Sequence, residues 1–243
     1  MASAQSVLIG GLMGYAFGNF GTGQERVNAE NALLLLLGLS AIWLGCNAAS
    51  KEIVGELAIF RRERDSNLST AAFVGAKFLV SGVFTVLQLA LVYALVGALA
   101  EDIPGDSLEQ FMLLTIGAMA GTAIGLLISA VADTPDQATM IVPLALVPQL
   151  ILAGVLVPKL PNLAEKLAKV GVSGYWLTEA MKSVFIAANG PIRAIDPHTG
   201  SLSNMTAEPA GLGAAIITLH ALAFLLIAYL VTLLRHGARR RGA

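Results

Sequence analysis

Charged residues are scarce in this chain of 243 residues. Asp, Glu, Lys and Arg make up 13% of it, whereas a typical soluble domain has roughly 25%. Apolar residues reach 56%, and the mean hydropathy is +0.75. The formal net charge is only −1, so the chain has no general electrostatic attraction for nucleic acids. This composition argues against a soluble enzyme, a nucleic-acid-binding protein and a disordered tail. It predicts membrane lipids as the surroundings.

The sequence also lacks the residues for several kinds of chemistry. Its single cysteine, Cys46, excludes an internal disulfide framework and a multi-cysteine metal site. No Gly-x-x-x-x-Gly-Lys-Ser/Thr motif is present, so this chain does not bind ATP phosphates itself. The apolar runs contain no His-Cys or His-Glu cluster for a metal and no Ser-His-Asp set at one depth. We therefore expect no catalytic residue, metal site or cofactor in this chain.

Long apolar runs dominate instead. A membrane-spanning helix needs about 20 mostly apolar residues, and no run alternates with the period of a membrane strand. The sequence therefore predicts helical spans. The first run has no basic region before it, unlike a signal peptide, and its start so near residue 1 suggests that the chain was cut from a longer one. The six runs are residues 6–20, 32–49, 71–100, 111–132, 139–157 and 211–234.

Basic residues gather beside the ends of the second, third and sixth runs. If both termini are cytoplasmic, the inner segments hold nine basic and six acidic residues, and the outer segments hold six basic and ten acidic residues. The outer loop of residues 101–110 has four acids and no base. Because basic residues are enriched in cytoplasmic loops, we expect a multi-pass protein of the cell membrane with both termini in the cytoplasm.

The spans carry no charge near mid-depth. Pumps and ion-coupled transporters usually have a charged residue there, so that class is disfavoured. A pathway lined by such spans is mostly apolar and would not compensate a charged solute for its lost hydration. The pattern favours an apolar or amphipathic substrate, such as a lipid or a lipid-linked glycan. His220, alone in the last run, is expected to be a hydrogen-bonded packing residue.

Glycines recur every four residues in the first and fourth runs. Small residues let helix backbones approach closely in a membrane. We favour packing between helices of one chain as their role, with a dimer seam as the alternative. The two series are Gly10, Gly14 and Gly18, and Gly117, Gly121 and Gly125.

The segment between the second and third runs is too charged to span. Its apolar positions recur at helical spacing, so residues 51–64 are predicted to form one amphipathic helix on the inner membrane surface, followed by a polar turn at residues 65–70. Ser69 or Thr70 can cap the third span. A partner that pushes on this turn could tilt both spans together. The apolar positions are Ile53, Leu57 and Phe60.

Two stretches of the chain carry a family resemblance. The first is Glu56-x-x-x-Phe60-x-Arg62-Glu63, followed by Phe73-x-x-Ala76-Lys77; the second is Ile151-Leu-Ala-Gly154-Val-Leu-Val, followed by Gly174-Tyr-Trp176-Leu-Thr-Glu179-Ala180. In this order and within six spans, they resemble ABC-2 type transporter permeases. The closest resemblance is to the G subfamily of ABC transporters, whose half-transporters fuse an ATPase to six spans. It covers residues from about 30 to 235.

The resemblance implies an all-α polytopic membrane domain over residues 1–243. It has six transmembrane helices, an amphipathic cytoplasmic connecting helix and coupling turn in residues 51–70, and an outer re-entrant helical hairpin and loop in residues 159–210. It also implies an ABC ATPase partner that holds ATP and Mg²⁺. That ATPase domain is not present in this chain and is either fused upstream or a separate subunit. A homodimer would then export its substrate by alternating access.

Roles for individual residues follow from the resemblance and from the apolar character of the spans. The residues expected to couple to the ATPase are Glu56, Arg62, Glu63, Asp65 and Asn67. Those expected to line the substrate pathway are Trp43, Asn47, Leu146, Gln149 and Leu150. The outer gate is expected at Gly154, Val155 and Leu156, where Val stands in place of a common Leu.

Two other classes remain open at this point. A non-transporting membrane scaffold or regulatory subunit would use the 51–64 segment to bind a cytoplasmic partner. An intramembrane lipid-modifying enzyme would use Asp196 and His198 of the outer loop, although a lone His-Asp pair beside a Pro-Gly turn is weak support.

Overall fold

The structure is a computed structural model that describes residues 2–19, 22, 24–64, 67–100, 103, 105–153, 160–190, 193–195, 202–204 and 207–237. Its helices are α1 (Ala2–Ala16), α2 (Gln24–Ala49), the 3₁₀ helix η1 (Val54–Glu56), α3 (Leu57–Arg64), α4 (Thr70–Leu99), α5 (Ser107–Val131), α6 (Pro135–Leu152), α7 (Asn162–Gly171), α8 (Ser173–Asn189) and α9 (Ala210–Gly237). Two short strands, β1 (Arg193–Ile195) and β2 (Leu202–Asn204), form an antiparallel hairpin that the sequence did not predict.

The predicted helical membrane fold is confirmed. Within the described residues, five helices are long and apolar enough to cross a membrane: α2, α4, α5, α6 and α9. The first apolar run forms α1, whose 15 residues extend about 22 Å at 1.5 Å per residue. That is shorter than the roughly 30 Å hydrocarbon core, so the sixth span stays a prediction.

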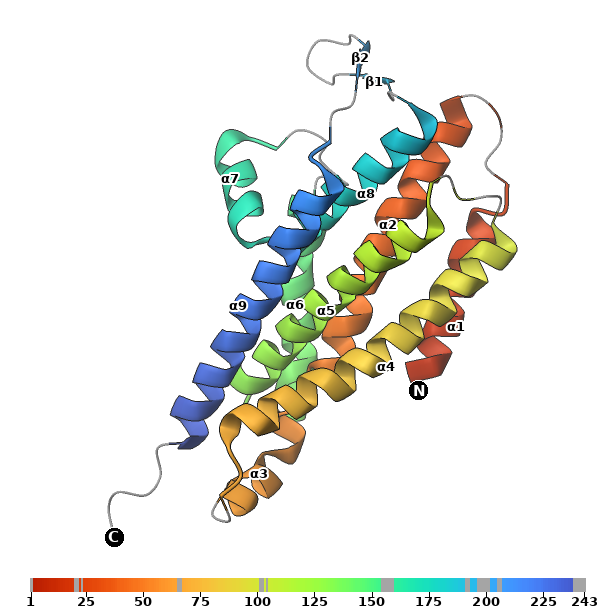
Figure 1. Ribbon diagram of the computed structural model, residues 1–243. Helices are drawn as coiled ribbons and strands as arrows, with labels where there is room; N and C mark the ends of the chain where they lie inside the picture. The colour runs from red at the N-terminus through yellow and green to blue at the C-terminus, as the bar shows by residue number, and fades with distance from the viewer. Residues whose placement is uncertain are drawn as a thin grey trace.

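Helix α5 lies at the centre of the bundle, with α2, α4, α8 and α9 packed around it (Figure 1). Its glycines allow these close contacts. A Cβ atom added at Gly121 would lie 2.9 Å from the carbonyl carbon of Ile42 on α2, and one added at Gly117 would meet the side chain of Leu177 on α8. The α5 glycines therefore pack helices of one chain together, as the sequence favoured.

The glycine series of α1 faces α4. A Cβ atom added at Gly10 would lie 3.0 Å from the Cα atom of Val92, and one added at Gly14 would lie 2.7 Å from the Cβ atom of Leu99. Both series are thus used inside the chain, and the described residues give no reason to place either of them in a dimer seam.

The segment that connects α2 to α4 lies at the same end of the bundle as the C-terminal end of α9 (Figure 1). Phe60 of α3 is fully buried in a small apolar cluster with Leu126 of α5 and Ala228 of α9. At the same end, Arg235 of α9 donates to Asp133, whose carboxylate lies 2.6 Å away, and to the carbonyl oxygens of Ala130 and Val131 at the end of α5. Arg235 at the end of α9 and the basic residues of α3 therefore lie at one end of the bundle.

Candidate functional site

Residues 50–70, which we call the elbow, carry most of the predicted functional residues. The helix predicted over residues 51–64 is confirmed over residues 54–64, where η1 runs directly into α3. Its predicted start was too early, because α2 ends at Ala49 and residues 50–53 form a turn. The turn is held from another helix: the Ser129 hydroxyl of α5 accepts hydrogen bonds from the backbone N–H groups of Ile53 and Val54, at 2.9 and 3.0 Å. Such a long-range contact leaves no local signal in the sequence.

The apolar side of the elbow is fixed by an aromatic pair. Phe60 on α3 stacks on Phe73 of α4, with ring centroids 4.4 Å apart and ring planes 26° apart. Ile53 and Phe60 of the predicted stripe are fully buried, and Leu57 is half-buried against the same cluster. The stripe is therefore confirmed as the face that packs on the bundle, even though the helix begins later than predicted.

The elbow returns to α4 through a capped turn. Asn67 has a positive φ of 75°, a backbone conformation that asparagine adopts more readily than most residues. The Ser69 hydroxyl then accepts a hydrogen bond from the backbone N–H of Ala72 at 3.1 Å, which is the predicted cap of the third span. The cap fixes where α4 begins and ties the turn to that helix.

A charge cluster joins the elbow to α4. The Lys77 ammonium group lies 2.6 Å from the Glu56 carboxylate and 3.0 Å from the Glu52 carboxylate. The Lys77 side chain is 15% exposed, whereas those of Glu52 and Glu56 are 36% and 47% exposed. The ammonium group also lies 6.0 Å from the centre of the Phe73 ring, within the range of a cation–π interaction. Lys77 is thus held by two acids of the elbow.

The predicted coupling residues divide into two groups. Glu56 faces the bundle through Lys77, whereas the side chains of Arg62, Glu63 and Asn67 are exposed. Asp65 lies outside the described residues. The elbow therefore has one face bound to α4 and α5 and another that is open to a partner.

Sequence reasoning missed three contributors to the elbow. Lys77 was noted only as part of the motif at the start of the third span, and Glu52 and Ser129 were given no role. A signal for Lys77 was present, because it is a lone cation two turns inside an apolar run and two acids of the neighbouring segment recur at a spacing of four residues. Ser129 could not have been found this way.

The residues predicted to line the substrate pathway differ in how exposed they are. Trp43 is 42% exposed on α2, and Asn47 is exposed one turn further on, with its side-chain amide donating to the Gln5 side chain at 2.9 Å. Leu150 is half-buried, whereas Leu146 and Gln149 are buried inside the chain. The predicted outer gate, Gly154, Val155 and Leu156, lies outside the described residues, as do Asp196 and His198.

Gln149 anchors the helical hairpin formed by α7 and α8. Its side-chain oxygen accepts a hydrogen bond from the backbone N–H of Gly174 at 2.9 Å, in the first turn of α8, where such N–H groups lack partners within the helix. The buried Ser173 hydroxyl lies 3.3 Å from Nδ1 of His220 on α9. His220 is therefore a hydrogen-bonded packing residue, as predicted.

Contacts within the hairpin also hold α7 against α8. The Trp176 indole N–H donates to the Lys169 carbonyl oxygen at 2.9 Å, and Tyr175 packs edge-on against Trp176. Burial raises the pKa of Tyr175, and a hydrogen bond to Glu165 raises the pKa of Lys169. These contacts make α7 and α8 a hairpin packed on α6 and α9, but whether it re-enters the membrane stays a prediction.

Replacing Gln149 with leucine tests the role of this side chain. We expect Gln149→Leu to leave the Gly174 N–H buried without a partner, at a cost of about 1–3 kcal/mol. Hydrogen exchange at the first turn of α8 should accelerate, while exchange in α2 and α5 should not change. The exposed Gln137 provides a matched control, because its side-chain oxygen accepts the Asp133 backbone N–H at 2.8 Å where water can replace it. Gln137→Leu should therefore leave exchange at the first turn of α8 unchanged.

The structure defines a helical, multi-pass membrane domain whose elbow has one packed and one open face. The ABC-2 type transporter family matches residues 1–184, so the chain belongs to this family. It is also similar to the ABC transporter ATP-binding/permease protein Rv1747 of Mycobacterium tuberculosis, with 32% identity over 164 residues. The match covers 64% of this chain and 18% of that protein. The chain therefore corresponds to a minor part of the length of that relative.

Proposed function

We propose that this membrane domain of the ABC-2 type is the permease half of an exporter driven by an ABC ATPase, and that the elbow is the contact through which nucleotide binding moves the spans. The observation that carries the proposal is that the elbow has one face packed on the bundle and one exposed face. Phe60 and Glu56 fix it to α4, while Arg62 and Glu63 are exposed at the end of the bundle. A similar chain is named as an ATP-binding/permease protein, which supports an ATPase as the partner. That partner would hold ATP and Mg²⁺ and is fused to the chain or separate from it.

We place the elbow and both termini in the cytoplasm of a cell-membrane protein. This placement is supported by the elbow and the C-terminal end of α9 lying at one end of the bundle (Figure 1), and by the enrichment of basic residues in cytoplasmic segments. An ATPase that pushes on the elbow then acts on α4 through the Ser69 cap and the Lys77 charge cluster.

The open apolar faces of α2 and α6 support a homodimer. Leu36 and Trp43 are 38% and 42% exposed on α2, and Leu144 and Val147 are 72% and 48% exposed on α6. Helices α2 and α6 are in contact, and we propose that these exposed side chains face a second copy across a shared pathway. Trp43, Asn47 and Leu150 would line it directly, and the buried Leu146 and Gln149 would support it from behind. Gly154, Val155 and Leu156 would close it on the outer side.

An apolar pathway suits an apolar or amphipathic substrate, such as a lipid or a lipid-linked glycan. Each CH₂ group that leaves water for such a surface contributes about 0.8 kcal/mol. A domain that alternates between inward-open and outward-open states could then move the substrate without any covalent step. A non-transporting scaffold would share the elbow contact but would not need these open faces.

Exposed elbow residues provide the test of coupling. We expect Arg62→Ala or Glu63→Ala to leave the fold intact, because both side chains are exposed. Each change should uncouple ATP hydrolysis from lipid movement. The measurement is ATPase rate and vectorial movement of labelled lipids, with the full transporter reconstituted in vesicles. Lys166→Ala, which removes an exposed cation from α7, is the control and should behave like the wild type. Unchanged coupling in both elbow variants would contradict the proposal, and an ATPase rate that no lipid alters would favour the scaffold.

A further inference from the structure

A groove of about 350 Å³ opens between the first turns of α5 and the first turns of α9. This end of the bundle is opposite the elbow (Figure 1). Its size falls in the range of about 300–1,000 Å³ that is typical of ligand sites. The α9 side of the groove is built from small residues, including Gly211 and Ala214. Their short side chains leave open the space that larger ones would fill.

The groove lies where the first turn of α9 packs closely against α8. A Cβ atom added at Gly213 would lie 2.9 Å from both the Ala180 Cβ atom and the Trp176 carbonyl oxygen. A Cβ atom added at Gly211 would meet nothing within 4 Å. The start of α9 is therefore pressed against α8 on one face and separated from α5 on the other.

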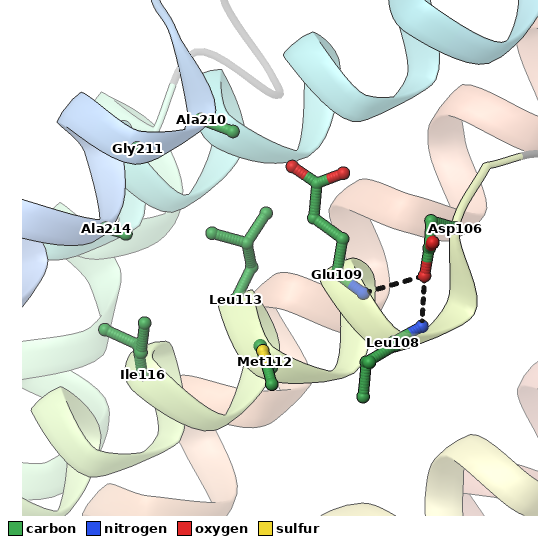
Figure 2. A pocket seen from close by; sticks show the side chains of 9 residues that line it. All are labelled: Asp106, Leu108, Glu109, Met112, Leu113, Ile116, Ala210, Gly211 and Ala214. Carbon is green, nitrogen blue, oxygen red and sulfur yellow. Dashed lines mark hydrogen bonds between the residues drawn. The ribbon is translucent and has the colours of Figure 1, made fainter.

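The lining of the groove is apolar below and acidic at the rim. Leu113 of α5 is buried and Ile116 is half-buried, so they line the deeper part, whereas the exposed Glu109 and Asp106 form the mouth. The Glu109 side chain points toward the first turn of α9 (Figure 2), and within the described part of the chain its carboxylate has no hydrogen-bond or ion-pair partner. None of the nine lining residues is basic.

Asp106 and Glu109 at the mouth of the groove carry more negative charge than the N-terminus of α5 can neutralise. One Asp106 oxygen accepts the backbone N–H groups of Leu108 and Glu109, at 2.8 and 3.1 Å, which caps the helix. The N-terminus of a helix carries only about half a positive charge, against two carboxylates. The mouth therefore attracts a cation and repels an anion.

We propose that this groove binds a membrane lipid with an amine headgroup, from the leaflet on the side opposite the elbow. An acyl chain would lie along Leu113, Ile116 and Ala214, and the ammonium group would pair with Glu109 and the free oxygen of Asp106. A phospholipid with ethanolamine fits this arrangement, whereas one with glycerol would bring only negative charge to an acidic mouth. This site does not depend on transport and is separate from the open faces of α2 and α6.

Photo-crosslinking of lipids to the full transporter in nanodiscs tests the site. The probes are phosphatidylethanolamine and phosphatidylglycerol with the same diazirine-bearing acyl chain, and labelled peptides are located by mass spectrometry. We expect phosphatidylethanolamine to label the peptides of residues 107–117 and 210–216 about two- to fivefold more than phosphatidylglycerol, in line with the strength of an exposed ion pair. A second groove, lined by Val74 and Gly75 of α4 and by Leu222 and Tyr229 of α9, has no acid and should show no preference.

Three variants distinguish the role of the acidic mouth from that of the apolar groove. Glu109→Gln combined with Asp106→Asn keeps a capping side chain and should abolish the preference while labelling continues. Gly211→Leu should fill the groove and reduce labelling by both lipids, since its side chain has room. Glu165→Gln, on α7, should change nothing. Equal labelling by the two lipids in the wild type, or labelling that Gly211→Leu leaves unchanged, overturns the proposal. A crosslink between two copies of the chain at this groove, without lipid labelling, also overturns it.

Discussion

Adding one methyl group to Gly121 or Gly45 will prevent α2 and α5 from packing and will sharply reduce the yield of folded protein. A Cβ atom at Gly121 would lie 2.9 Å from the Ile42 carbonyl carbon, and one at Gly45 would lie 2.7 Å from the Thr122 backbone nitrogen. These neighbours are backbone atoms in a helix and cannot rotate away. We therefore expect Gly121→Ala and Gly45→Ala each to cost at least the roughly 1–3 kcal/mol of ordinary overpacking.

The measurement is the amount of monodisperse protein recovered in detergent and its thermal midpoint. Gly97→Ala is the matched control, because Gly97 lies in α4 and an added Cβ atom meets nothing within 4 Å. Since alanine favours a helix more than glycine does, this control should be as stable as the wild type or slightly more stable. Wild-type yield from the Gly121 and Gly45 variants would show that α2 and α5 are further apart than the structure places them.

The sequence was sufficient to predict the helices and much of their packing. Apolar runs of span length predicted α2, α4, α5, α6 and α9, and the four-residue glycine repeats predicted close packing within the chain. Gly45 was not recognised, because it stands alone in α2 and only the structure shows it against α5. A periodic signal is readable from one sequence, whereas a single contact between distant helices is not.

The candidate site was less predictable than the fold. The apolar stripe of the elbow correctly indicated which face packs on the bundle, because amphipathic spacing is a local property. The break after Ala49 was missed, since it depends on the Ser129 hydroxyl of α5. The burial of Gln149 was also missed, because its partner, the Gly174 N–H, belongs to a later helix. The functional roles of these residues remain predictions.

Removing the Lys77 cation will weaken the attachment of the elbow to α4 and uncouple ATP hydrolysis from substrate movement. In Lys77→Met the apolar stem is kept, but the Glu52 and Glu56 carboxylates lose their shared cation and repel one another. Because both glutamates are more than one-third exposed, we expect a loss of about 1–2 kcal/mol, below the roughly 3–5 kcal/mol of a fully buried pair. Lipid movement per ATP hydrolysed should fall by about tenfold, which corresponds to about 1.4 kcal/mol.

A double-mutant cycle isolates the interaction. Glu56→Gln and Lys77→Met should each reduce coupling, and the double variant should be less impaired than the sum of the two, because contacting residues are not additive. Lys169→Met breaks another Lys–Glu pair, with Glu165 at 2.8 Å on α7, and should leave coupling unchanged. Strict additivity in the cycle would show that the Lys77–Glu56 contact does not act in the coupling step.

We propose that the elbow faces the cytoplasm and binds an ABC ATPase there, and cysteine labelling tests both points. Cys46 is the single cysteine of this chain and is fully buried, so once any cysteines of the ATPase are replaced, a membrane-impermeant maleimide will report mainly on an introduced cysteine. In the full transporter, we expect Arg62→Cys to be unlabelled in intact cells, labelled in inside-out vesicles, and protected when ATP is added. Lys166→Cys, at the opposite end of the bundle, should show the reverse sidedness and no effect of ATP. Labelling of Arg62→Cys from outside intact cells would show that the elbow is not cytoplasmic, and labelling in vesicles that ATP does not change would show that no ATPase covers it.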